Sequence, residues 1–144
     1  MIIHLTLILF LVIGTVSDLR KRTLPIMLFA VFGLSGIVIN ITAGQVKAGL
    51  TVNWLFGFVL GIVFIAISLI SDKKLGMGDA LAILVTGIYL GGNDSALAVL
   101  YAMMVASLFS IVFLVLKKGS GKTELPFMPF LLTGCILQQI GALI

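Results

Sequence analysis

The stretch from Leu50 to Ile70, LTVNWLFGFVLGIVFIAISLI, contains no charged side chain and decides the fold class. A helix of this length is long enough to cross the hydrocarbon core of a bilayer, which is roughly 30 Å thick. The whole chain has the same character, because 61% of its 144 residues are hydrophobic, 10% are charged and the mean hydropathy is +1.33. This composition excludes an ordinary soluble domain and predicts an all-α, polytopic membrane protein.

Similar apolar runs lie on both sides of this stretch, and we expect one domain over residues 1–144 with about six transmembrane helices. The fourth run is short for a full span. The first run is not preceded by basic residues and is followed by charges, which favours a retained helix over a signal peptide. The expected helices are Ile2–Ser17, Leu24–Ile41, Leu50–Ile70, Asp79–Leu90, Ser95–Leu116 and Pro126–Ile144.

The basic residues are distributed unevenly among the connections. Eight of the nine Lys and Arg residues fall in the first, third and fifth connections, and only Lys47 falls in the second. Short basic loops stay on the cytoplasmic side, so we expect both termini on the outer side. This placement explains the formal net charge of +4 better than nucleic-acid binding does. The single cysteine, Cys135, rules out an internal disulfide and a Cys-rich zinc site, and we expect no metal and no cofactor.

Two of the five acidic residues adjoin apolar helices directly. Asp18 ends the first apolar run and Asp79 opens the fourth, so both are expected at the same, cytoplasmic membrane face. Ionisable side chains at such positions usually mark a site of function. Taken singly, Asp18 could be a boundary residue, and Asp79 could be a helix N-cap. Asp72 and Asp94 are expected to be solvated loop charges.

Two adjacent carboxyl groups can divide the work of peptide hydrolysis. Since both cannot ionise cheaply, one keeps a proton near neutral pH. The ionised group then takes a proton from water, and the protonated group donates to the scissile carbonyl or the leaving amine. Asp79 closes the string Gly76-Met77-Gly78-Asp79, and we expect the glycines to adopt unusual backbone conformations and to let an extended peptide approach.

Three motifs, in order along the chain, resemble those of the type IV prepilin peptidases, which are membrane aspartic proteases with a GxGD motif. The first is Asp18-Leu19-Arg20-Lys21-Arg22-Thr23-Leu24-Pro25, in which an aspartate precedes basic residues and a Leu-Pro pair. The second is the Gly76–Asp79 string, and the third is Pro126-Phe127-Met128-Pro129. The resemblance implies that Asp18 and Asp79 are catalytic, and that Gly76, Met77, Gly78, Pro25 and Pro126 shape the substrate site.

The resemblance also implies the substrate, which is the short basic leader of a prepilin or pseudopilin, cut at the cytoplasmic face of the inner (plasma) membrane. Larger members have an N-terminal, Cys-containing region and an N-methyltransferase activity, so this chain is expected to be a short form with peptidase activity only. It departs from the family at Ile26, where Asn or Asp is usual, and at Leu81, where Lys is frequent. Glu124 is a candidate to attract the positive charge of the leader.

Two other functions remain open from the sequence. A small transporter or channel component could use its aspartates to carry protons or cations, although acids near mid-membrane would then be expected. An inactive subunit of a pilus or secretion assembly would also fit, since intact aspartates do not prove activity. The particular substrate, the roles of the two aspartates and the oligomeric state do not follow from the sequence.

Overall fold

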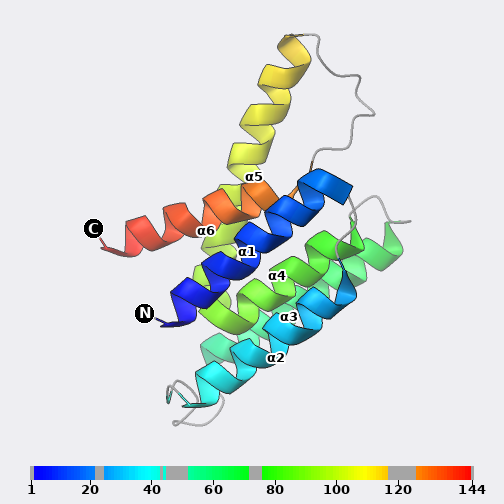
Figure 1. Ribbon diagram of the computed structural model, residues 1–144. Coiled ribbons are helices and arrows are strands. Elements are labelled where there is room, and N and C mark those ends of the chain that lie inside the picture. Colours follow the sequence, from blue (N-terminus) through cyan, green and yellow to red (C-terminus); the bar gives the residue numbers. More distant parts are fainter. Residues whose placement is uncertain are drawn as a thin grey trace.

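The computed structural model describes residues 2–21, 25–42, 44, 52–71, 76–116 and 126–143, and these residues form six helices (Figure 1). The number and order of the helices agree with the all-α fold expected from the sequence. The helices are α1 (Ile2–Lys21), α2 (Ile26–Thr42), α3 (Val52–Ile70), α4 (Met77–Leu90), α5 (Gly92–Val115) and α6 (Met128–Leu143).

Three of these helices are long and apolar enough to cross a membrane. They cover Ile2–Arg20, Val52–Ile70 and Gly92–Val115. Large apolar side chains are exposed along them, as expected for a surface that faces lipid. Both termini lie at the same end of the bundle (Figure 1), and α5 continues past the other helices at the opposite end. The fold is therefore that of a helical membrane protein.

Helix α4 is the shortest of the six and lies at the centre, where it contacts α1, α2, α3 and α5. Its 14 residues rise only about 21 Å, less than the thickness of the hydrocarbon core. Most of its side chains are buried by the surrounding helices, so its length need not match the bilayer. The centre of the bundle therefore holds the helix that begins with the Gly76–Asp79 motif.

Glycines let α3 and α4 approach backbone to backbone. A Cβ atom added at Gly57 would lie 2.5 Å from the carbonyl oxygen of Gly87, and one added at Gly61 would lie 2.5 Å from the Cα of Leu84. Small residues at such spacing are typical of close helix contacts in membranes. Here the glycines allow close packing between two helices of the same chain.

The connection between α4 and α5 is tighter than the four-residue loop expected from the sequence. Only Gly91 separates the two helices, and its φ of 79° lies in the left-handed region that glycine adopts without strain. Asp94 therefore lies in the first turn of α5 rather than in a solvated loop, so the loop expectation was wrong. The backbone N–H of Asn93 donates to Oδ1 of Asn53, 3.0 Å away, and ties this turn to α3.

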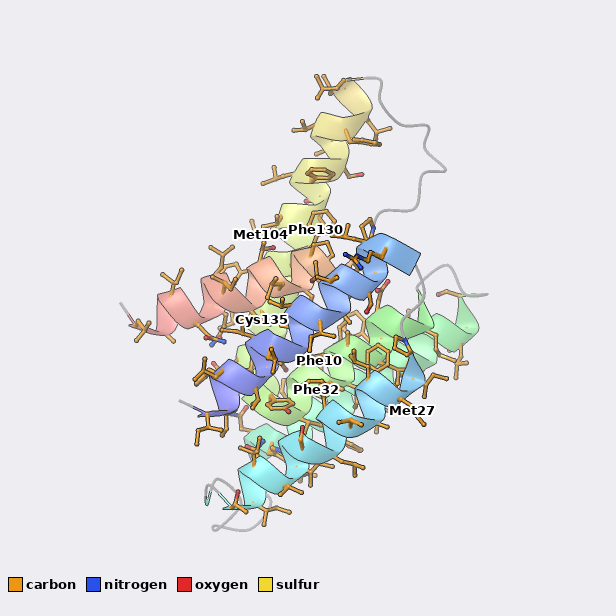
Figure 2. All side chains as sticks on the ribbon, viewed as in Figure 1. Phe10, Met27, Phe32, Met104, Phe130 and Cys135 are labelled. Carbon is orange, nitrogen blue, oxygen red and sulfur yellow. The ribbon has the colours of Figure 1, made fainter. Side chains whose placement is uncertain are left out.

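Aromatic side chains join α1 to α2, and α5 to α6. Phe10 and Phe32 lie between α1 and α2 with ring centroids 5.2 Å apart (Figure 2), and Phe10 meets Phe29 at 5.9 Å. Phe109 of α5 and Phe130 of α6 have centroids 5.5 Å apart. These contacts fix α1 and α6, whose ends carry part of the candidate site.

Candidate active site

Asp18 lies in the last turn of α1, where it is half-buried. The sequence-based boundary placed it just after the helix, but the helix continues to Lys21. Basic residues in a last turn interact favourably with the negative end of the helix dipole, which explains the continuation. Oδ2 of Asp18 accepts a hydrogen bond from the backbone N–H of Met128, with a distance of 3.4 Å between nitrogen and oxygen.

Asp79 lies in the first turn of α4, two residues after the helix begins. The N-cap of α4 is Gly76, whose carbonyl oxygen accepts the N–H groups of Asp79 at 3.0 Å and Ala80 at 3.2 Å. The alternative in which Asp79 is itself the N-cap is therefore wrong. Its carboxyl group is half-buried and is not occupied in capping its own helix.

Gly76 lies directly against this carboxyl group. A Cβ atom added at Gly76 would be 2.9 Å from Oδ2 of Asp79 and 3.4 Å from its Cγ. The backbone of Gly76 has φ −57° and ψ 130°, which any residue can adopt. The expectation that this glycine is needed for an unusual conformation was therefore wrong. What the motif needs at this position is space for the aspartate.

The two aspartates influence each other electrostatically. Asp79 lies outside the three helices that are long enough to cross a membrane. The pKa of Asp79 is raised from 3.8 to about 6. Burial is the larger cause of this rise, and the negative charge of Asp18 is the smaller one. The carboxyl groups of Asp18 in α1 and Asp79 in α4, 61 residues apart in the sequence, are thus electrostatically coupled.

The other residues predicted for the site lie at the same end of the bundle or outside the described residues. Pro25 is exposed just before α2, and its carbonyl accepts the N–H of Leu28 at 3.0 Å. Met77 is 47% exposed at the start of α4, and Gly78 beside it is half-buried. Pro126 is half-buried just before α6. Glu124, like Asp72, lies outside the part of the chain that the structure describes.

The two departures from the family pattern occupy different environments. Ile26 is exposed as the first residue of α2. Leu81 is half-buried and packs against the hydrophobic core, two residues after Asp79. Among the described residues, no three His, Cys, Asp or Glu side chains gather in a way that could hold a metal ion.

Sequence reasoning missed Met128 as a contact of the site. The third motif pointed to this region through its prolines, but not to the backbone donor between them. The contact depends on how α6 crosses α1, and a pattern along one chain segment does not contain that information. The signal that could have found it is the start of α6, because the N–H groups of a first helical turn need acceptors.

The helices and the paired carboxyl groups define the class as a helical membrane protein with an aspartate pair at one end of its bundle. The family model of the type IV leader peptidase family matches residues 5–115, which include both aspartates and the Gly76–Asp79 motif. The chain belongs to this family. The Pro126–Pro129 motif lies beyond the matched residues.

Two curated relatives are both described as prepilin leader peptidase/N-methyltransferase, from Aeromonas salmonicida and from its strain A449. Each is 28% identical to this chain over 124 residues, which is 84% of this chain and 43% of the relative. The chain thus spans less than half the length of these relatives. No solved structure matches it significantly.

Proposed function

We propose that the chain is an aspartic endopeptidase that cuts the short basic leader from prepilins or pseudopilins at the cytoplasmic face of the inner membrane. The observation that carries this proposal is the pairing of Asp18 with Asp79, whose pKa is raised to about 6 by burial and by the charge of Asp18. Membership of the leader peptidase family supports the substrate class. Activity without N-methyltransferase, metal or cofactor is part of the proposal.

The chemistry follows from one proton shared between two carboxyl groups. In the singly protonated pair, the ionised group takes a proton from a water molecule as the oxygen of that water forms a bond to the scissile carbonyl carbon. The other group donates its proton to the carbonyl oxygen, and later transfer of a proton to the amine lets the C–N bond break. The raised pKa of Asp79 brings its titration close to neutral pH, which supports an acid–base function of the two carboxyl groups acting as one unit.

The location of the pair supports a substrate whose cleaved bond lies just outside a membrane helix. Both aspartates lie in terminal turns of their helices rather than at mid-length. The exposed Met77 and Pro25 lie at the same end and offer apolar surface to a peptide. This placement disfavours a transporter, whose ion-carrying acids are expected deeper in the membrane.

Cleavage of a prepilin with a basic leader tests the proposal, with the native chain beside Asp18→Asn and Asp79→Asn. We expect the native chain to convert the prepilin to its mature size and each variant to lose at least about a thousandfold in rate, because the acid–base pair then lacks one member. The measurement is the shift in size of the prepilin at equal membrane levels of each variant. Cleavage that persists in either variant would contradict the two-aspartate chemistry.

A further inference from the structure

The backbone N–H groups in the first turn of α6 have an unusual set of hydrogen-bond partners. The N–H groups of Phe130 and Leu131 both donate to the carbonyl oxygen of Phe127, at 3.0 Å each. Pro129 has no N–H to donate. Of residues 128–131, Met128 alone therefore carries an N–H directed out of the helix, and it donates to Oδ2 of Asp18.

We propose that this turn is a positioning element for the catalytic Asp18, and that Met128 acts through its backbone N–H rather than its side chain. The inference rests on the proposed peptidase function. The 3.4 Å bond from this main-chain donor is one of the contacts of the Asp18 carboxylate, and it restricts the directions in which the carboxylate can point. Pro129 removes one donor from the turn, and Pro126 lies just before the helix and restricts the backbone there.

Side-chain packing holds the same turn against the helix that carries Asp18. Met128 is fully buried, and a Cβ atom added at Gly14 would lie 2.8 Å from its Cε. Gly14 and Asp18 are four residues apart and so share one face of α1. Met128 thus contacts two successive turns of α1, by its side chain at Gly14 and by its N–H at Asp18. On the other side, Phe130 is held by the ring of Phe109.

The test removes the donor while controlling for the side chain. Met128→Ala and Met128→Pro both lose the buried thioether, but only the proline variant loses the N–H. Proline is well tolerated at the first position of a helix, and it asks the preceding residue to be extended, as N-cap residues usually are. We expect kcat for prepilin cleavage to be about tenfold lower in Met128→Pro than in Met128→Ala, because one hydrogen bond to a charged group is lost. KM should agree between the two variants.

Equal kcat values in the two variants, with an active native chain, would overturn the positioning role and leave the proposed function intact. If the native chain cleaves no prepilin, the proposed function and the positioning role fall together. Should Met128→Pro not accumulate in membranes, an ester at position 128, made with the α-hydroxy analogue of methionine, removes the same N–H and keeps the side chain. Its kcat should be about tenfold below that of the native chain, and an unchanged kcat would overturn the proposal.

Discussion

At Gly76 the absence of a side chain makes room for the carboxyl group of Asp79, which would lie 2.9 Å from an added Cβ. In Gly76→Ala the carboxyl group must rotate or shift by a few tenths of an ångström. Misplaced catalytic groups lose rate steeply, so we expect kcat to fall about tenfold. The backbone angles of Gly76 suit alanine, so the thermal midpoint should not fall.

Gly141→Ala is the control for Gly76→Ala, because nothing lies within 4 Å of a Cβ at Gly141. The test compares the two variants in detergent by their rates of prepilin cleavage and their unfolding midpoints. A stable Gly76→Ala variant with full kcat would mean that the space beside Asp79 has no catalytic importance. A variant that loses stability instead would show that the overlap is relieved by distorting the start of α4 rather than by moving the carboxyl group.

The shifted titration of Asp79 predicts how stability changes with pH. Its pKa is about 6 in the folded chain against an ordinary value of 3.8, so the folded chain binds this proton more tightly than the unfolded chain does. The free energy of unfolding therefore falls as pH rises from 3.8 through about 6, and the loss is complete above that range. Asp79→Asn cannot ionise and should escape this loss.

We accordingly expect Asp79→Asn to be more stable than the native chain at pH 7.5, by about 2 kcal/mol after a discount for partial exposure of the carboxyl group. The difference should shrink below the folded-state pKa of about 6 and vanish near the ordinary value of 3.8. Unfolding midpoints of both proteins across this range provide the measurement. A difference that is constant with pH would show that burial does not perturb Asp79.

At the scale of the element, α6 depends on one close approach to α5. A Cβ atom added at Gly134 would lie 2.7 Å from the backbone nitrogen of Ala102 and 2.9 Å from its Cβ. Backbone atoms in a packed helix pair cannot yield cheaply, so Gly134→Ala should destabilise the chain by about 2 kcal/mol. On the same helix, Gly141→Ala meets open space and should be neutral or slightly stabilising, because alanine favours helix.

Gly134→Ala should also reduce prepilin cleavage, since α6 brings the Met128 N–H to Asp18. The two alanine variants are compared by thermal unfolding and by cleavage rate. Similar midpoints for both would mean that α5 and α6 separate easily, and α6 would then be a poor support for a catalytic group. This outcome would count against the packing described for the α5–α6 pair.

The helices were predictable because their signals are local. Long apolar runs, basic connections and the prolines before α2 and α6 each lie within one segment, and they placed Asp18 and Asp79 at one end of the bundle. The contacts that refine the site are not local. The Met128–Asp18 hydrogen bond depends on how α6 packs against α1, and the space beside Gly76 depends on the first turn of α4. The single-residue turn at Gly91 depends on how α4 meets α3 and α5.

At the scale of the whole molecule, the two ends of the bundle have different chemistry. The end opposite the aspartates is joined by polar contacts among α2, α3 and α4. The carbonyl oxygen of Ile88 accepts both Nδ2 of Asn40 at 2.9 Å and Nε1 of Trp54 at 3.2 Å, and the hydroxyl groups of Tyr89 and Ser35 are 2.8 Å apart. This network fixes the far ends of the helices.

The charge distribution predicts which end faces the cytoplasm. Eight of the nine Lys and Arg residues lie in the last turn of α1 or in the connections that follow α1, α3 and α5, so the aspartate end should remain inside. The native Cys135 is fully buried and should not react with a membrane-impermeant maleimide, so the native chain should give no labelling signal. Single cysteines can then report each end: Ser71→Cys after α3 at the aspartate end, and Asn93→Cys, at an exposed position, at the other.

In intact cells we expect the maleimide to label Asn93→Cys and to leave Ser71→Cys unlabelled until the membrane is opened. The native chain should stay unlabelled in both states, which controls for exposure of Cys135. The reverse pattern would place Asp18 and Asp79 outside the cell. Since a leader that has not crossed the membrane could not then reach them, that result would remove cytoplasmic leader cleavage from the functions this chain can have, even with its aspartate pair intact.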